Sequence, residues 1–152
     1  MPSFDSHVFD ITRVIQLAVA PVFLLTAIGT IINALINRLG RAVDRRRTLD
    51  ELLPAYEGEK HQDMVIELRI LARRIVLVLW SIALAVLSAL LVCLLIGTAF
   101  VGAFIALDLS RPVALLFIAA MVALTGCLIL FMREVFLAAL TVHHGVSIRP
   151  HG

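Results

Sequence analysis

The sequence predicts an all-α membrane protein, with three transmembrane helices and a cytoplasmic antiparallel helical hairpin formed by extensions of the first two. The composition is apolar: 61% of the 152 residues are hydrophobic, only 16% are charged, and the mean hydropathy is +1.03. A soluble domain carries about a quarter charged residues. Three stretches lack any Asp, Glu, Lys, Arg or His, and each exceeds the roughly 18 apolar residues that indicate a membrane-spanning helix. They are residues 14–37, 75–107 and 112–132.

The first transmembrane helix is predicted at residues 11–36, after an outward-facing N-terminal tail at residues 1–10. This apolar stretch does not resemble a cleavable signal peptide, because no basic segment precedes it and no small-residue cleavage site follows it. No residue beyond it stops a helix until Pro54, so we expect the helix to extend past the membrane.

The hairpin is predicted over residues 37–74, with its turn near residues 54–60, where the sequence reads PAYEGEK. After the turn, apolar residues recur at alternating spacings of four and three, which is the pattern of a coiled-coil seam. These residues are Met64, Leu68, Leu71, Ile75, Val78 and Ile82.

Charge pairs across the hairpin follow from the position of the turn. Folding the chain back near Tyr56 places Arg45 opposite Glu67. It also brings the neighbouring carboxylate, Asp44, within reach of Arg69 or Arg73.

Basic residues concentrate in the hairpin, since nine of the thirteen Lys and Arg residues lie between Arg38 and Arg74. The positive-inside rule therefore places this segment in the cytoplasm, the N-terminus outside and the C-terminus inside. The most basic parts are expected to contact anionic lipid headgroups. They are the cluster of Arg38, Arg41, Asp44, Arg45, Arg46 and Arg47, and the pair Arg73 and Arg74.

The second transmembrane helix, residues 75–107, contains 33 uncharged residues. This corresponds to about 50 Å of helix against a hydrocarbon core of about 30 Å, so the helix must tilt, protrude or break. An outer turn at 108–111 leads to the third transmembrane helix at 112–132, which Ser110 is expected to cap. Residues 133–152 are predicted to form a cytoplasmic helix end and tail.

The sequence does not predict an enzyme. It contains no Gly-rich phosphate loop and no His-Glu-x-x-His pattern, and its five histidines lie in the tails or near the hairpin turn. No carboxylate lies within the three uncharged stretches, whereas proton-driven carriers place ionisable groups inside the membrane. We therefore expect no catalytic residue, no cofactor and no metal. The net charge of +2 is too small to indicate a nucleic-acid partner.

Polar residues recur along one face of the first transmembrane helix. We call this set the polar stripe: Gln16, Thr26, Thr30, Asn33 and Asn37. An unpaired polar group in hydrocarbon costs several kcal/mol, so the stripe must meet another helix or water. Two interpretations remain open, a helix–helix contact made by Thr and Asn side chains and the lining of a pore or groove.

Small residues form patches on the second and third transmembrane helices, and these patches favour close helix contacts. The patches are Ser81, Ala85, Ser88 and Ala89 on one helix and Ala119, Ala123, Gly126 and Cys127 on the other. Three helices offer few faces for so many small and polar positions. We therefore predict a homo-oligomer, with other membrane proteins as possible further partners.

Residues 11–47 carry two blocks that mark a resemblance. One is the run QLAVAPVFLL at residues 16–25, and the other is NRLGRAVDRRR at residues 37–47. In both, the chain resembles a family of small bacterial membrane proteins, domain-of-unknown-function family twenty-seven twenty-one. The resemblance implies a protein of the bacterial inner (cytoplasmic) membrane with three spans and no assigned activity.

These observations favour an oligomeric channel or pore-like assembly lined by the polar face of the first helix. In it, Arg38, Arg41 and Arg45 would form a cytoplasmic vestibule that attracts anions. The alternative is a non-conducting assembly or scaffold factor, because the topology resembles that of minimal members of the membrane-insertase superfamily. A structural or stress-related membrane protein without a transport role is a third interpretation.

Overall fold

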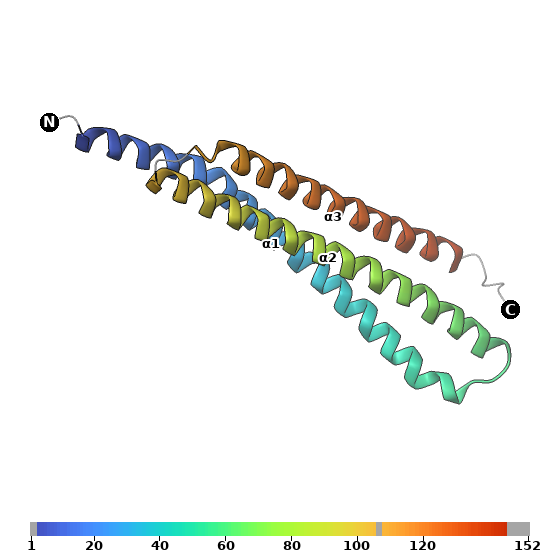
Figure 1. The fold of residues 1–152 in the computed structure, drawn as a ribbon. Helices are drawn as coiled ribbons and strands as arrows, with labels where there is room; N and C mark the ends of the chain where they lie inside the picture. Colours follow the sequence, from blue (N-terminus) through green and yellow to red (C-terminus); the bar gives the residue numbers. More distant parts are fainter. Residues whose placement is uncertain (1–2, 106–107, 146–152) are drawn as a thin grey trace. The chain divides into compact units, whose positions relative to one another are not determined.

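The computed structural model describes the backbone of residues 3–105 and 108–145, and the side chains of residues 19–105 and 108–136. Over these ranges the chain is helical and contains no strand. Its long helices are α1 (Ser3–Leu52), α2 (Glu59–Ile105) and α3 (Ser110–Gly145) (Figure 1). Each is long and apolar enough to cross a membrane. The all-α prediction with three such helices is confirmed, and these helices indicate a membrane location.

Helix α1 continues without interruption through 50 residues. The helix includes residues 3–10, although residues 1–10 were predicted to form a tail. Residues 3–10 contain no Gly or Pro that would oppose a helix. The helix stops at Leu52, two residues before Pro54, because a proline disfavours the helical conformation of the residue that precedes it.

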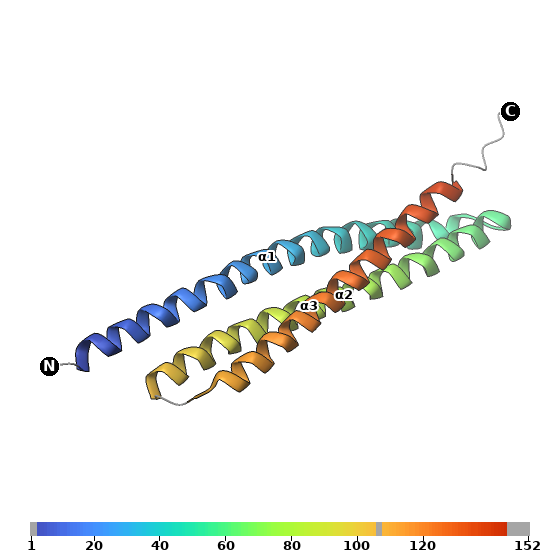
Figure 2. The ribbon, with the colours of Figure 1, turned by 90° about the horizontal axis from the view of Figure 1, so that it is seen from above.

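The connection between α1 and α2 is short. A single turn of 3-10 helix, η1 (Leu53–Ala55), is closed by a hydrogen bond from the Tyr56 amide to the Leu53 carbonyl. Gly58 then adopts a φ of +73°, a conformation that residues with a side chain rarely take. The chain enters α2 at the next residue (Figure 2).

The connection between α2 and α3 uses a side-chain acceptor. The backbone amide of Ser110, the first residue of α3, donates a hydrogen bond of 3.1 Å to Oδ1 of Asp108. The predicted capping residue, Ser110, therefore lies within the helix, and Asp108 supplies the acceptor. An Asp fits this role because its carboxylate accepts hydrogen bonds from the free amides at a helix start.

The chain forms two compact units. Unit 1 comprises Met1–Ile32 and Leu84–Thr125, and unit 2 comprises Asn33–Ala83 and Gly126–Gly152. The described buried residues of unit 1 are Ile28, Ala85, Ser88, Val92, Leu95, Gly102, Ala120, Ala123 and Leu124. Those of unit 2 are Leu35, Leu49, Leu71, Val78, Ser81, Cys127 and Glu134.

Buried positions along α2 recur at spacings of seven, three, four, three, four, three and seven. They are Leu71, Val78, Ser81, Ala85, Ser88, Val92, Leu95 and Gly102. Leu71 and Val78 belong to the predicted seam, but the next buried residue is Ser81 rather than Ile82. The small side chains allow neighbouring helices to approach closely, which is how helices associate in a membrane.

Large apolar side chains are exposed on all three helices. Examples are Phe23, Trp80, Phe104, Leu115 and Phe136. Such a surface suits contact with lipid tails, which agrees with a membrane location.

Candidate functional site

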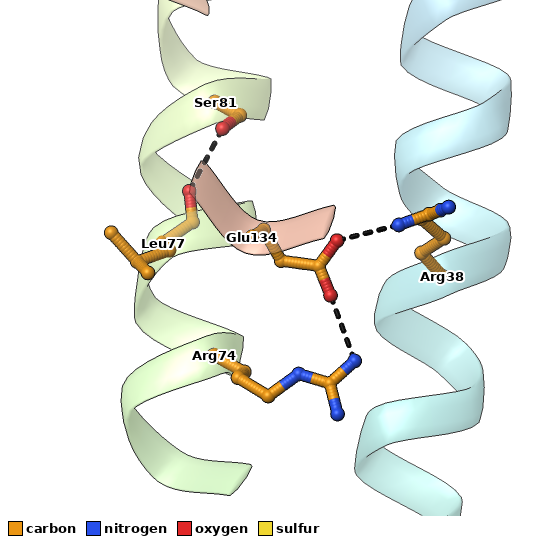
Figure 3. A network of polar contacts seen from close by, with 5 residues as sticks. All are labelled: Arg38, Arg74, Leu77, Ser81 and Glu134. Atoms are coloured by element: carbon orange, nitrogen blue, oxygen red, sulfur yellow. Dashed lines mark hydrogen bonds and ion pairs between the residues drawn. The ribbon is translucent and has the colours of Figure 1, made fainter. Parts of the chain in front are cut away.

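A buried carboxylate on α3 joins the three helices within unit 2. Glu134 has only 3% of its side chain exposed. Its Oε2 accepts a hydrogen bond of 2.7 Å from Nη1 of Arg38 on α1, and its Oε1 accepts one of 2.9 Å from Nη2 of Arg74 on α2. Figure 3 shows the carboxylate between the two guanidinium groups, with one oxygen turned to each. We call these residues the Arg38–Glu134–Arg74 cluster.

Helical spacing explains why these three residues meet. Arg38 and Arg74 each follow a buried leucine by three residues, and Glu134 follows the buried Cys127 by seven. Residues three or seven apart lie on nearly the same side of a helix, so all three side chains are directed towards the packed interior.

Two further contacts lie near the cluster. The Arg38 guanidinium lies 5.0 Å from the centre of the Phe131 ring, which fixes it by a cation–π contact. One turn before Ser81, the Leu77 carbonyl accepts a hydrogen bond of 2.9 Å from the Ser81 hydroxyl, so this buried polar group is satisfied within α2 (Figure 3).

The cluster carries a net charge of +1, because two arginines share one carboxylate. Charge-assisted hydrogen bonds stabilise the buried Glu134, and removing one partner from a buried ion pair costs about 3–5 kcal/mol. The arginines are less enclosed: 33% of the Arg38 side chain and 25% of the Arg74 side chain are exposed. Nε of Arg74 is buried and has no hydrogen-bond partner among the described residues.

The polar stripe is exposed and does not join this cluster. Four of its members, Thr26, Thr30, Asn33 and Asn37, have exposed side chains, and the side chain of Gln16 lies outside the described residues. The two threonines satisfy their hydroxyl groups locally. Oγ1 of Thr26 donates to the Val22 carbonyl (3.3 Å), and Oγ1 of Thr30 donates to the Thr26 carbonyl (3.0 Å).

The predicted basic cluster divides into several small groups. Arg38 belongs to the buried site, and Arg45 pairs with Glu67 at 2.9 Å, so that predicted pairing is confirmed. Two exposed ion pairs lie within α1 itself. They are Arg46 with Asp50 (3.6 Å) and Arg47 with Glu51 (3.1 Å).

Two members of the basic cluster remain, Arg41 and Asp44. Neither forms an ion pair with another described residue, so the predicted pairing of Asp44 with Arg69 or Arg73 is not observed. The backbone carbonyl of Asp44 accepts a hydrogen bond from the Thr48 hydroxyl one turn further along α1, but this bond does not involve the carboxylate. An exposed ion pair between Asp44 and either arginine would gain little free energy in water and would cost side-chain entropy, so the fold does not require it.

Sequence reasoning missed Glu134, which it assigned to the cytoplasmic end of the third helix without a role. A signal was present. Arg38, Arg74 and Glu134 all lie within two residues of an end of an uncharged stretch, and Glu134 is the only carboxylate so placed at these three ends. A single carboxylate among several arginines at one level is a candidate for burial between them.

Comparison with known proteins gives a family match over most of the chain. Residues 18–144 match the family model described as "Protein of unknown function (DUF2721)". No curated protein matches the chain, and no solved structure does.

Proposed function

The chain belongs to DUF2721, a family of unknown function, and we propose that it is a non-enzymatic protein of the bacterial inner membrane that forms homo-oligomers. In the proposed assembly, the polar stripe of α1 faces other copies and lines a pore-like path. The observation that supports this proposal is the exposure in the single chain of the four described members of the stripe, Thr26, Thr30, Asn33 and Asn37.

The stripe lies opposite the packed face of α1. That packed face is defined by Ile28, Leu35 and Leu49, which are buried and spaced by multiples of seven. At 3.6 residues per turn, Thr26, Thr30, Asn33 and Asn37 lie on the other side of the same helix. In a membrane this side would meet lipid unless another protein surface or water covers it, and exposing the Asn33 carboxamide to lipid tails is costly.

A second copy of the chain is a suitable partner for this face. Each Asn carboxamide both donates and accepts hydrogen bonds, so the stripe can pair with an identical stripe. Self-complementary faces of this kind generate symmetric oligomers. Polar contacts between membrane helices contribute roughly 0.6–2 kcal/mol each, so several are needed along the stripe.

For the topology we propose that the segment around the α1–α2 connection forms an antiparallel hairpin in the cytoplasm. The positive-inside rule supports this orientation, because residues 38–74 hold nine of the thirteen basic residues. The ion pair between Arg45 and Glu67 supports the hairpin itself, since it joins α1 to α2 across the connection.

The expected ion preference of such a pore is weak. Of the three arginines proposed for the vestibule, Arg38 pairs with Glu134 and Arg45 pairs with Glu67. Arg41 is exposed and has no ion pair with a described residue. A small preference for anions is therefore expected.

Site-specific crosslinking tests the self-association. In a background with Cys93→Ser and Cys127→Ala, the variant Asn33→Cys should give a crosslinked dimer in membranes. The matched control, Ile129→Cys, places the thiol on an exposed apolar position of α3 and should not give a crosslinked dimer. Crosslinking at residue 129 and not at residue 33 would contradict the proposed interface.

Ion flux tests the pore. Purified protein in liposomes should pass ions, and Asn33→Leu should reduce that flux at least severalfold, because it replaces a polar lining group by an apolar one. Ile129→Leu should leave the flux unchanged. Flux no greater than in protein-free vesicles would exclude the pore. It would not exclude the homo-oligomer, which the crosslinking experiment tests separately.

A non-conducting scaffold or assembly factor is the second candidate. It is favoured by Ile66 and Ile70, which are exposed on the basic segment of α2 outside the uncharged stretches. Exposed apolar residues beside charged ones are typical of protein contact surfaces. A monomeric mass in detergent, together with no flux, would favour this candidate.

A further inference from the structure

The Arg38–Glu134–Arg74 cluster lies at the level where the apolar stretches end. Arg38 follows the uncharged stretch of α1 directly, Arg74 directly precedes that of α2, and Glu134 lies two residues beyond that of α3. The hydrogen bonds of 2.7 Å and 2.9 Å bring these three ends together within unit 2. In a membrane, the end of an apolar stretch lies beside the lipid headgroups.

Positive charge is in excess at this level. The residues within a few positions of the cluster on the three helices are 37–41, 73–77 and 131–134. They contain five arginines and one carboxylate, Glu134. The three further arginines, Arg41, Arg73 and Arg133, have exposed side chains and form no ion pair with a described residue.

The two arginines of the cluster retain unused hydrogen-bonding capacity. An arginine carries five N–H donors, but the contacts with Glu134 use one nitrogen of each guanidinium. A third of the Arg38 side chain and a quarter of the Arg74 side chain are exposed, so both guanidinium groups retain surface outside the contact with Glu134. The contact with Phe131 fixes the Arg38 guanidinium in this position.

Exposed apolar residues precede Arg38 and its aromatic contact, Phe131, by one helical turn on the side of the uncharged stretches. Ala34 precedes Arg38 by one turn of α1, and Leu128 precedes Phe131 by one turn of α3, and both are exposed. A ligand at Arg38 would therefore have a charged headgroup at the guanidinium and apolar chains along these residues.

We propose that the Arg38–Glu134–Arg74 cluster is a binding site for the phosphate headgroup of an anionic phospholipid. The phosphate is held by the guanidinium donors that Glu134 leaves free, and the acyl chains lie along Ala34 and Leu128. Basic sites between transmembrane helices on the cytoplasmic side are suited to such headgroups, and bidentate arginine contacts are suited to phosphate. This inference does not depend on the proposed pore, because the cluster lies within a single chain.

Native mass spectrometry of the full-length protein in detergent tests the proposal, with phosphatidylglycerol as the probe and zwitterionic phosphatidylcholine as its control. Wild-type protein should bind phosphatidylglycerol more tightly than phosphatidylcholine. Arg38→Gln should weaken phosphatidylglycerol binding about tenfold or more, the effect expected for the loss of a hydrogen bond between charged groups. The matched control, Arg46→Gln, removes an arginine that pairs with Asp50 outside the cluster and should change binding much less.

Glu134→Gln gives a prediction of opposite sign and remains informative if Arg38→Gln reduces folding. Because the carboxylate occupies donors on both arginines, its neutralisation should strengthen phosphatidylglycerol binding severalfold. Glu67→Gln removes the same charge and frees Arg45, and should strengthen binding less. Equal effects of the cluster and control variants would overturn the site, since they would indicate only general attraction to the basic segment.

A third arm distinguishes a lipid from free phosphate. Inorganic phosphate in large molar excess should leave most of the bound phosphatidylglycerol in place, because it lacks the acyl chains that contact Ala34 and Leu128. Complete displacement by inorganic phosphate would overturn the assignment to a lipid.

Discussion

Unit 1 and unit 2 hold their helices together by different polar contacts. In unit 1, α2 and α3 are joined by a hydrogen bond: among the described residues, the buried Ser88 hydroxyl on α2 donates to the Ala120 carbonyl on α3 (2.8 Å). In unit 2, ion pairs join the helices, with Glu134 between Arg38 and Arg74, and Arg45 paired with Glu67.

The difference follows from the distance of each contact to water. Ser88 and Ala120 lie inside uncharged stretches, where an ion would be costly and a small hydroxyl can be satisfied by a carbonyl. Arg38, Arg74 and Glu134 lie at the ends of these stretches, where the arginines can keep part of their surface in a polar environment. Each unit thus uses a kind of polar contact that its surroundings can accommodate.

The largest expected effect comes from removing the carboxylate of unit 2. Glu134→Ala leaves Arg38 and Arg74 without their shared partner in a mostly buried position, so it should lower the free energy of unfolding by about 3 kcal/mol. The measurement is thermal or denaturant unfolding of the purified protein in detergent. The matched control is Glu67→Ala, which breaks the exposed pair with Arg45 and should cost about 1 kcal/mol or less. Equal losses of unfolding free energy in the two variants would show that the burial of Glu134 does not make its ion pairs more important for stability than the exposed pair.

A smaller effect is expected in unit 1. Ser88→Ala removes the hydrogen bond to the Ala120 carbonyl while keeping the small size that close packing needs, so the loss should be about 1 kcal/mol. The control is Thr125→Ala, because the Thr125 hydroxyl bonds only to the Met121 carbonyl of its own helix and is exposed. Unfolding of both variants in the same detergent measures the difference. A Ser88→Ala loss as large as that of Glu134→Ala would contradict the comparison between the units.

The sequence was sufficient to predict the three apolar helices, because the length and hydropathy of the uncharged stretches can be read from the chain without knowledge of tertiary contacts. It was also sufficient for the pair of Arg45 with Glu67, since a short turn determines which residues face each other. It was not sufficient for Glu134, because its partners Arg38 and Arg74 lie 96 and 60 residues away and packing decides which of many arginines it meets. The stripe of Thr26, Thr30, Asn33 and Asn37 was predicted from spacing, but only the structure indicates that the rest of the chain leaves it exposed.

The α1–α2 connection in unit 2 depends on a glycine conformation. Gly58 has a φ of +73°, so Gly58→Ala should destabilise the protein by about 1 kcal/mol. Gly40 lies inside α1, and an added Cβ there would meet no atom within 4 Å, so Gly40→Ala should instead stabilise by up to about 1 kcal/mol. Unfolding measurements on the two variants should therefore shift in opposite directions. A loss of stability in Gly40→Ala would indicate that another surface covers this position.

The α2–α3 connection in unit 1 depends on a charge, and here the smallest effect is expected. The side-chain and backbone hydrogen bonds of Ser110 lower the pKa of Asp108 below its ordinary value, because they favour the ionised carboxylate. A group whose pKa is lowered on folding stabilises the folded state above its ordinary pKa, near pH 4, and this contribution is lost as the pH falls through the lowered value. The Ser110 amide should therefore lose protection from hydrogen exchange below about pH 4. In Asp108→Asn the amide oxygen still accepts the hydrogen bond but does not titrate, so protection should no longer depend on pH in this range. A pH dependence that persists in Asp108→Asn would assign the effect to another group, and the start of α3 would then not depend on this carboxylate.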